Sequence, residues 1–190
     1  MNMLQNYIKT VYTPLVLRRQ TFYNWLNKVF NQVDEDRRKE VGPDRTCAEW
    51  LLRNGAFVKW VNEYDFITDY NKLPCDETKV YIIEVDATEA SVMHYGFEHF
   101  VGCKHIRKIN FHKCSYLENQ ALKGLSPLEN SLRSLRISEC MNITEKGLLY
   151  LTVLRHLEEL ILVNLPYVKD KEKVMNQLRS DLPRCNIQFH

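Results

Sequence analysis

Two histidines and two cysteines lie close enough in the chain to suggest a metal site. Cys103 and His105 are separated by one residue, and His112 and Cys114 repeat that spacing a few residues later. Imidazole and thiolate groups are common zinc ligands, but many structural zinc sites also present a C-x-x-C pair, which this segment lacks. We therefore expect no zinc site here, and we interpret Cys114 as a packing residue because it belongs to the repeat described below.

Acidic side chains are the other candidates for chemistry. Asp86 and Glu89 flank Thr88 and could attract a hard cation, although isolated surface acids are usually only solvated. The chain contains no G-x-x-x-x-G-K-[ST] phosphate loop, no H-E-x-x-H zinc helix and no G-x-S-x-G nucleophile turn. We assign no catalytic residue, and we expect a protein that is not an enzyme and has no small-molecule substrate.

An internal repeat must position these residues. Residues 106–128 reappear 26 positions later as residues 132–154, and a third copy follows 25 positions after that. The matching apolar positions are Ile106, Ile109, Phe111 and Cys114, then Leu132, Leu135, Ile137 and Cys140, then Leu157, Leu160, Leu162 and Leu165. A degenerate first copy, shifted by 26 residues, is expected at Val80, Ile83, Val85 and Thr88.

This pattern is typical of leucine-rich repeats, in which L-x-x-L-x-L-x-x-[NC] forms a short strand and the remainder a returning helix. It predicts an α/β fold: a short Cys-type leucine-rich-repeat solenoid of about four repeats, with an N-terminal helical cap domain. Alternate side chains of a strand share a face, so the remaining strand positions form the concave surface. These outward positions are Glu84, Lys108, Asn110, Ser134, Arg136, Glu159 and Ile161.

The N-terminal part of the chain differs in charge from the rest. Residues 1–33 contain four basic residues and no acid, while the whole chain has a net charge of only +2, which argues against a nucleic-acid binder. The acid-free residues 1–21 resemble a mitochondrial targeting segment, although an ordinary amphipathic terminus is the alternative. No apolar run is long enough to span a bilayer, and the scattered cysteines fit a reducing compartment.

Helical spacing after the targeting segment predicts an amphipathic helix with an aromatic face. This face contains Phe22, Trp25, Leu26, Val29, Phe30 and Val33. It must pack on the protein's own body, on a subunit or on a membrane surface. Residues 22–78 are expected to form the cap, in which Asp44 or Thr46 caps a helix containing Trp50 and Gly55 provides a left-handed C-cap. Residues 79–190 would form the repeat domain, closed by a helix and an edge strand at residues 185–189.

Several short blocks outside the repeats resemble the family of mitochondrial coupling factor B, also called ATP synthase subunit s, and its relative, the distal membrane arm assembly component of complex I. The resemblance covers the chain from Phe22 onward. Its most specific blocks are Val41-Gly-Pro-Asp-Arg45 and Glu49-Trp-Leu-Leu-Arg53, and it also rests on Gly55-Ala56, Asp69-Tyr-Asn71, Asp86-Ala-Thr88, Gly96-Phe97, Lys113-Cys114, Asn142-Ile-Thr144 and Leu165-Pro166.

The resemblance implies a non-enzymatic, peripheral protein on the matrix side of the mitochondrial inner membrane that contacts membrane-sector subunits of the ATP synthase and limits proton leak. It also implies Mg²⁺ held by the main-chain carbonyls of Gly55 and Thr88, with water completing the ligands. The helix residues Phe22, Trp25, Leu26, Val29 and Phe30 would make the partner or membrane contact. His112 and Asn54 stand where family members can have cysteine, so a dithiol function is in doubt.

Two other functions remain open at this point. The same architectural family contains assembly factors for the membrane arm of respiratory complex I. Alternatively, Cys-type repeats occur in substrate receptors of ubiquitin ligases, which would require a cytosolic location and an adaptor-binding helical module before the repeats.

Overall fold

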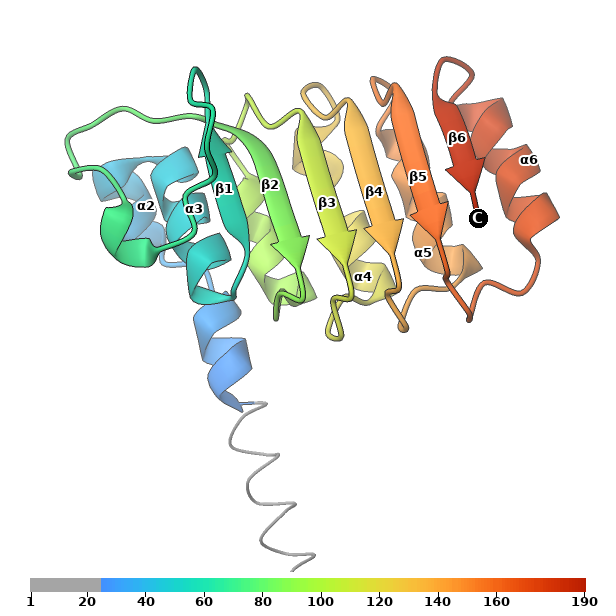
Figure 1. Cartoon of the computed structure of the whole chain (residues 1–190), viewed down its shortest axis with the longest axis horizontal. Helices are drawn as coiled ribbons and strands as arrows, with labels where there is room; N and C mark the ends of the chain where they lie inside the picture. Colours follow the sequence, from blue (N-terminus) through green and yellow to red (C-terminus); the bar gives the residue numbers. More distant parts are fainter. Residues whose placement is uncertain (1–24) are drawn as a thin grey trace, which may run out of the picture.

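The computed structural model describes residues 25–190, which form a mixed α/β fold (Figure 1). It contains one sheet, and helices cover one of the two faces of this sheet. The strands follow sequence order across the sheet: β1 (Phe57–Trp60), β2 (Ile82–Thr88), β3 (Lys108–His112), β4 (Ser134–Ser138), β5 (Glu159–Val163) and β6 (Asn186–Phe189). β1 is antiparallel to β2, and the other neighbours are parallel.

Helical segments precede the first strand and connect the strands that follow. They are a helix over residues 25–31, α2 (Glu35–Val41), α3 (Pro43–Arg53), α4 (Asn119–Lys123), α5 (Glu145–Leu149) and α6 (Lys171–Asp181), with short 3-10 helices η1 (Tyr70–Lys72), η2 (His94–Phe100), η3 (Ser126–Leu128) and η4 (Tyr150–Val153). Within residues 25–190, none of these helices is long and apolar enough to cross a bilayer.

The predicted repeat offsets are confirmed for three of the strands. Leu135 of β4 pairs with Ile109 of β3, 26 residues earlier, and with Leu160 of β5, 25 residues later. All three side chains are fully buried. The seven predicted outward residues all line one shallow cavity of about 340 Å³ on the open face of the sheet. The repeat therefore sets both the strand register and the two faces.

The predicted position of the first copy was wrong by two residues. Val85 pairs with Ile109 and Ala87 with Phe111, so the offset is 24 residues rather than 26. Ile82 is buried in place of Val80, and Ile83 is only half buried. A shift of two residues leaves every side chain of a strand on the same face, so the alternation of apolar residues could not reveal the error.

Each parallel strand of the repeat region ends in the same unusual backbone conformation. Glu89, Lys113, Glu139 and Asn164 have positive φ angles of 57°, 55°, 55° and 48°. Their N–H groups donate to backbone carbonyls at the end of the next strand, as from Glu89 to His112 over 2.7 Å. The following residue then turns into the core, where Cys114 and Cys140 are fully buried. This confirms that Cys114 is a packing residue.

The predicted cap segment contributes both helices and a strand. Its start differs from the expectation, because Gly42 is the N-cap of α3 and Pro43 is its first residue, so neither Asp44 nor Thr46 caps the helix. The Asp44 carboxylate instead accepts the Ile82 N–H over 2.9 Å and so fixes the start of β2. Gly55 adopts the expected left-handed conformation, with φ of 82°. Of the aromatic residues in this segment, Trp60 is buried, whereas Tyr64 is 93% exposed.

The C-terminal end is closed as predicted. α6 buries Val174 and Leu178 against the last unit, and β6 pairs with β5 in parallel. The buried apolar residues form one continuous core from α3 to β6.

Candidate functional site

The histidine and cysteine residues considered for zinc are not brought together. Cys103 donates from its buried thiol towards the His99 carbonyl over 3.5 Å, while the His105 ring contacts the Tyr81 ring in a tilted arrangement with centroids 4.4 Å apart. His112 hydrogen-bonds through Nδ1 to the Ser138 hydroxyl over 2.8 Å. Among residues 25–190, no three His, Cys, Asp or Glu side chains form a group that could hold a metal ion.

The buried Cys114 thiol lies against Cys140 of the next unit. Hydrogen bonding with Cys140, together with burial, raises the pKa of Cys114. A thiol with a raised pKa is a poor nucleophile, so this position fits a packing role. All six cysteines are free.

The N-terminal helix, defined here as residues 25–31, presents its predicted apolar face to the outside. Trp25 is 58% exposed, Val29 42% and Phe30 43%, while Leu26 is half buried. Phe22, the first predicted contact residue, and the predicted targeting segment lie outside the described residues. Large apolar side chains gathered on one helix face are a common sign of a docking surface.

The helix ends at residue 31 and does not extend to Val33 as predicted. Asp34 has an extended backbone, and its carboxylate caps α2 by accepting the Arg37 N–H over 2.9 Å. A residue cannot adopt this N-cap conformation and continue a preceding helix, so the chain turns between the two helices. Val33 lies half buried in that turn.

Asn31 anchors the N-terminal helix to the body of the protein. Its side chain is fully buried, and its Oδ1 atom accepts the Trp50 indole N–H over 3.0 Å and the Met93 backbone N–H over 2.9 Å. Its amide nitrogen donates to the Asn27 carbonyl, to Asn54 Oδ1 and to the Ser91 carbonyl over 2.8, 2.9 and 3.2 Å. One side chain therefore joins the helix, α3 and the loop after β2.

Asn54 completes this buried network from the other side. Its amide nitrogen donates to the Phe30 carbonyl over 3.2 Å and to the Trp50 carbonyl over 2.8 Å. The Asn54 carbonyl accepts the Ser91 N–H over 2.8 Å. A cysteine at this position could not make the two amide donations. Asn54 therefore has a specific structural role.

Trp50 and His99 form the floor beneath the anchor. Their rings stack with centroids 5.1 Å apart, and His99 Nε2 donates to the Gln32 carbonyl over 3.2 Å, just after the helix. Burial lowers the pKa of His99 to about 4. The Trp50 ring also lies against Gly96, where an added Cβ would come within 2.3 Å of the indole nitrogen. The neutral imidazole and the missing side chain at Gly96 both hold Trp50 where Asn31 can reach it.

A cluster of ion pairs explains the motif residues between Arg45 and Arg53. The Glu49 carboxylate is buried and lies 2.7 Å from Arg37 Nη2 and 3.0 Å from Arg45 Nε. Burial raises the pKa of Glu49, but the two guanidinium groups more than offset this and lower it overall. Arg37 also binds Asp76, in the loop before β2, with two hydrogen bonds of 2.8 and 2.9 Å. These residues fasten α2, α3 and that loop together.

The two predicted Mg²⁺ ligands lie at the same end of neighbouring strands. Phe57 pairs with Asp86, and extending this antiparallel register by two residues brings Gly55 opposite Thr88. A Cβ on Gly55 would be 4.0 Å from the Ala90 Cα, so the two backbone segments approach closely. Asp86 lies next to them and accepts the Thr88 N–H and hydroxyl over 3.0 and 2.6 Å. Backbone carbonyl and carboxylate oxygens, which this position brings near one another, are the ligand types that a hard cation prefers.

The buried anchor could not be found from the sequence. Asn31 is three or four residues from its helix neighbours but nineteen from Trp50 and more than sixty from Met93, and no local pattern reports such distant partners. The apolar stripe predicted a face that packs against a partner surface, and within residues 25–190 the structure leaves much of this face exposed. The stripe gave no sign of what holds the opposite side of the helix.

Comparison with curated proteins identifies relatives that match most of the chain. "ATP synthase subunit s, mitochondrial" of Bos taurus is 42% identical over 172 residues, which cover 88% of this chain and 86% of the relative. The proteins of the same name from Homo sapiens and Mus musculus are also 42% identical, over 172 and 173 residues, with the same 86% of each relative covered. No family model matches the chain.

Proposed function

The chain belongs to the family of mitochondrial ATP synthase subunit s, and from this membership we propose that it is a non-enzymatic accessory subunit of the mitochondrial ATP synthase. It would act by contact, as a peripheral protein on the matrix side of the inner membrane, and would support coupled proton conduction by limiting leak through the membrane sector. In this proposal the series of strand and helix units is a Cys-type leucine-rich-repeat solenoid that carries the docking helix on its first unit.

The observation that carries the proposal is the N-terminal helix. Its apolar residues Val29 and Phe30 face outward, while Asn31 on the same helix is fully buried and bonded to Trp50. A helix that is fixed to the body on one side and apolar on the other is pre-organised for binding, because little conformational freedom is lost when a partner covers it. We propose that this exposed face docks on membrane-sector subunits or on the adjoining membrane surface.

A bound Mg²⁺ at Gly55 and Thr88 would support the same region. The two carbonyls would hold the ion, Asp86 would balance part of its charge, and water would supply the other ligands. The ion would contribute rigidity where the Asn54 carbonyl meets Ser91, beside the anchor of the helix. This role is structural, and no catalytic step is assigned to the metal.

Removal of the protein from mitochondria tests the function directly. If it limits leak, respiration without ATP synthesis should rise in its absence and return to normal when the wild-type chain is restored. The ATP synthase itself should remain assembled on native gels. Unchanged coupling after complete removal would contradict the proposal.

The same native gels distinguish the assembly-factor alternative. Loss of complex I intermediates, with coupling of the ATP synthase intact, would assign the chain to complex I assembly instead. The family named by the relatives favours the ATP synthase.

A further inference from the structure

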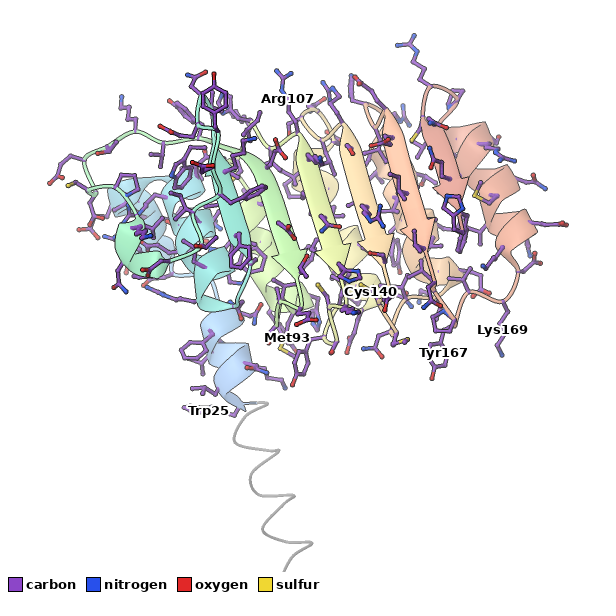
Figure 2. The ribbon with its side chains drawn as sticks, in the orientation of Figure 1. Trp25, Met93, Arg107, Cys140, Tyr167 and Lys169 are labelled. Atoms are coloured by element: carbon purple, nitrogen blue, oxygen red, sulfur yellow. The ribbon has the colours of Figure 1, made fainter. Side chains whose placement is uncertain are left out.

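The N-terminal helix is one end of a longer exposed surface, which we call the edge surface. It runs along the loops that follow the carboxyl ends of the parallel strands, and Figure 2 shows Trp25, Met93 and Tyr167 along this edge. Its large exposed side chains are Trp25, Val29, Phe30, Tyr95, Met141 and Tyr167, which are 42% to 58% exposed. Aromatic residues and methionine are enriched in protein interfaces, so this row is an interface candidate in composition as well as in position.

A chain of contacts joins the helix to the loops. Lys28 of the helix lies over the Tyr95 ring, with Nζ 5.9 Å from the centroid, and the Tyr95 and His94 rings are 3.9 Å apart. His94 Nδ1 lies 3.9 Å from a carboxylate oxygen of Glu118, at the end of the next unit. Asn31 fixes the helix to the same edge through Met93 and Ser91. The helix and the loops therefore form one surface.

A cavity of about 460 Å³ lies on this surface beyond Glu118. The rings of Tyr150 and Tyr167 and the Met141 side chain line it, together with the charged groups of Glu118 and Lys146. Two of the amide groups in its wall are already bonded within the protein: Asn119 with Thr144, and Asn142 with the Ser115 carbonyl over 2.6 Å. A ligand would therefore meet two tyrosine residues, the exposed Glu118 carboxylate and the exposed Gln120 side chain.

The surface suits a protein better than a lipid bilayer. The edge is mixed in charge: Glu139 lies 3.9 Å from Lys113, and Glu118 shares the cavity with Lys146, so an anionic membrane surface would find little net positive charge to attract it. A cavity of this size can take one large side chain, and such pockets commonly hold the anchors of protein interfaces. Tyrosine rings beside a carboxylate favour a cation, because the ring faces and the carboxylate both attract positive charge.

We propose that the whole edge surface, from Val29 to Tyr167, binds a single protein partner, and that the partner presents an apolar segment carrying one arginine or lysine side chain that enters the cavity beside Glu118. This inference rests on the proposed docking of the N-terminal helix, since it extends that contact along the edge. It gives the repeat units a direct part in binding rather than the role of a spacer.

Photo-crosslinking in intact mitochondria tests this extension. A photoreactive phenylalanine derivative is placed in the full chain at Val29, at Met141 or, as a control, at the exposed Val101, which precedes β3 and so lies at the opposite edge. Probes at Val29 and at Met141 should crosslink to the same protein. The probe at Val101 should not crosslink to that protein. A product from Val29 alone would overturn the extended surface while leaving the helix contact intact; products from neither site would contradict both.

Charge reversal tests the chemistry of the anchor. Glu118→Lys should lower the crosslinking yield from Met141 by about tenfold, the effect expected for a charge pair that loses its partner in an interface. Lys146→Glu, in the same cavity, should keep or raise the yield. A lower yield with Lys146→Glu than with Glu118→Lys would contradict an arginine or lysine side chain of the partner in the cavity. Crosslinks from Met141 to lipid alone would contradict a protein partner and show that the surface faces a membrane.

Discussion

The side chain of Asn31 accepts the indole N–H of Trp50 over 3.0 Å, although the helix carrying Asn31 exposes its apolar residues to the outside. The N-terminal helix is thus held by a polar network rather than by its apolar stripe. Deleting the segment to test docking would also leave the Trp50 indole and the Met93 N–H without their acceptor. Substitutions on the exposed face, and separately in the anchor, distinguish binding from stability.

Asn31→Leu should destabilise the protein and loosen the N-terminal helix. The change leaves the Trp50 and Met93 N–H groups buried without an acceptor, which costs on the order of 3 kcal/mol of unfolding free energy. Trypsin should then cut after Lys28 faster than in the wild type. Gln32→Ala, an exposed side chain next in sequence, should change the unfolding free energy by less than about 0.5 kcal/mol. Equal effects of the two substitutions would show that Asn31 is not the anchor.

Gly96→Ala should have a similar effect from the other side of Trp50. The added methyl group would lie 2.3 Å from the indole nitrogen, so the ring must move away from Asn31. Overpacking of this kind costs about 1–3 kcal/mol. Gly42→Ala is the matched control, since it also strains a backbone with a positive φ, of 86°, but meets no atom within 4 Å and lies outside the anchor. Only Gly96→Ala should speed cleavage after Lys28; protection equal to that of Gly42→Ala would contradict the contact.

Stability should fall in mild acid because of His99. Burial lowers the pKa of His99 to about 4 in the folded protein, whereas the unfolded value is about 6.5. The unfolded chain therefore binds the proton more readily between these pH values. The contribution of His99 to the unfolding free energy is fully present above about pH 6.5 and is lost as the pH falls towards 4. The unfolding free energy lost over this range is on the order of 3 kcal/mol. Denaturant unfolding across this range should show the loss, and His99→Gln, which cannot titrate, should flatten it.

The parts of the fold that the sequence predicted are those with local, repeated signals. The apolar residues Leu135 and Ile137 are separated by one polar residue, and the same spacing recurs in the next unit. This pattern predicted the strand, its buried face and its register together. The offset of the first unit was missed because a shift of two residues preserves the alternation at Val85. The cap of α3 was misassigned because Asp44 is engaged by the distant Ile82 N–H rather than by its own helix.

The candidate site was predictable only on its outer side. The spacing of Val29 and Phe30 indicated an apolar helix face, and the structure shows it exposed. The inner side depends on Asn31, Asn54 and Ser91, which are brought together by tertiary structure alone. Likewise, the proposed carbonyl ligands of Gly55 and Thr88 would leave no side-chain signature, so only family resemblance pointed to them.

Addition of Mg²⁺ should raise the unfolding temperature of metal-free protein. A single site filled at about 100 times Kd adds about 2.7 kcal/mol to the unfolding free energy. Asp86→Asn should weaken this effect, because it removes the balancing charge while its side-chain oxygen can still accept the Thr88 N–H. Sodium chloride at the same ionic strength is the control for screening. An equal response to both salts would exclude a specific site.

Co-purification with the ATP synthase tests the central proposal most directly. Tagged wild-type chain and a Val29→Ser/Phe30→Ser variant are expressed in mitochondria lacking the native protein, and the detergent-solubilised ATP synthase bound to each is quantified. Both substitutions lie on the exposed face, so trypsin cleavage after Lys28 and the unfolding free energy should remain close to wild type. The wild type should retain the ATP synthase, and the folded variant should lose most of it. Equal retention by the two chains would contradict docking through the N-terminal helix.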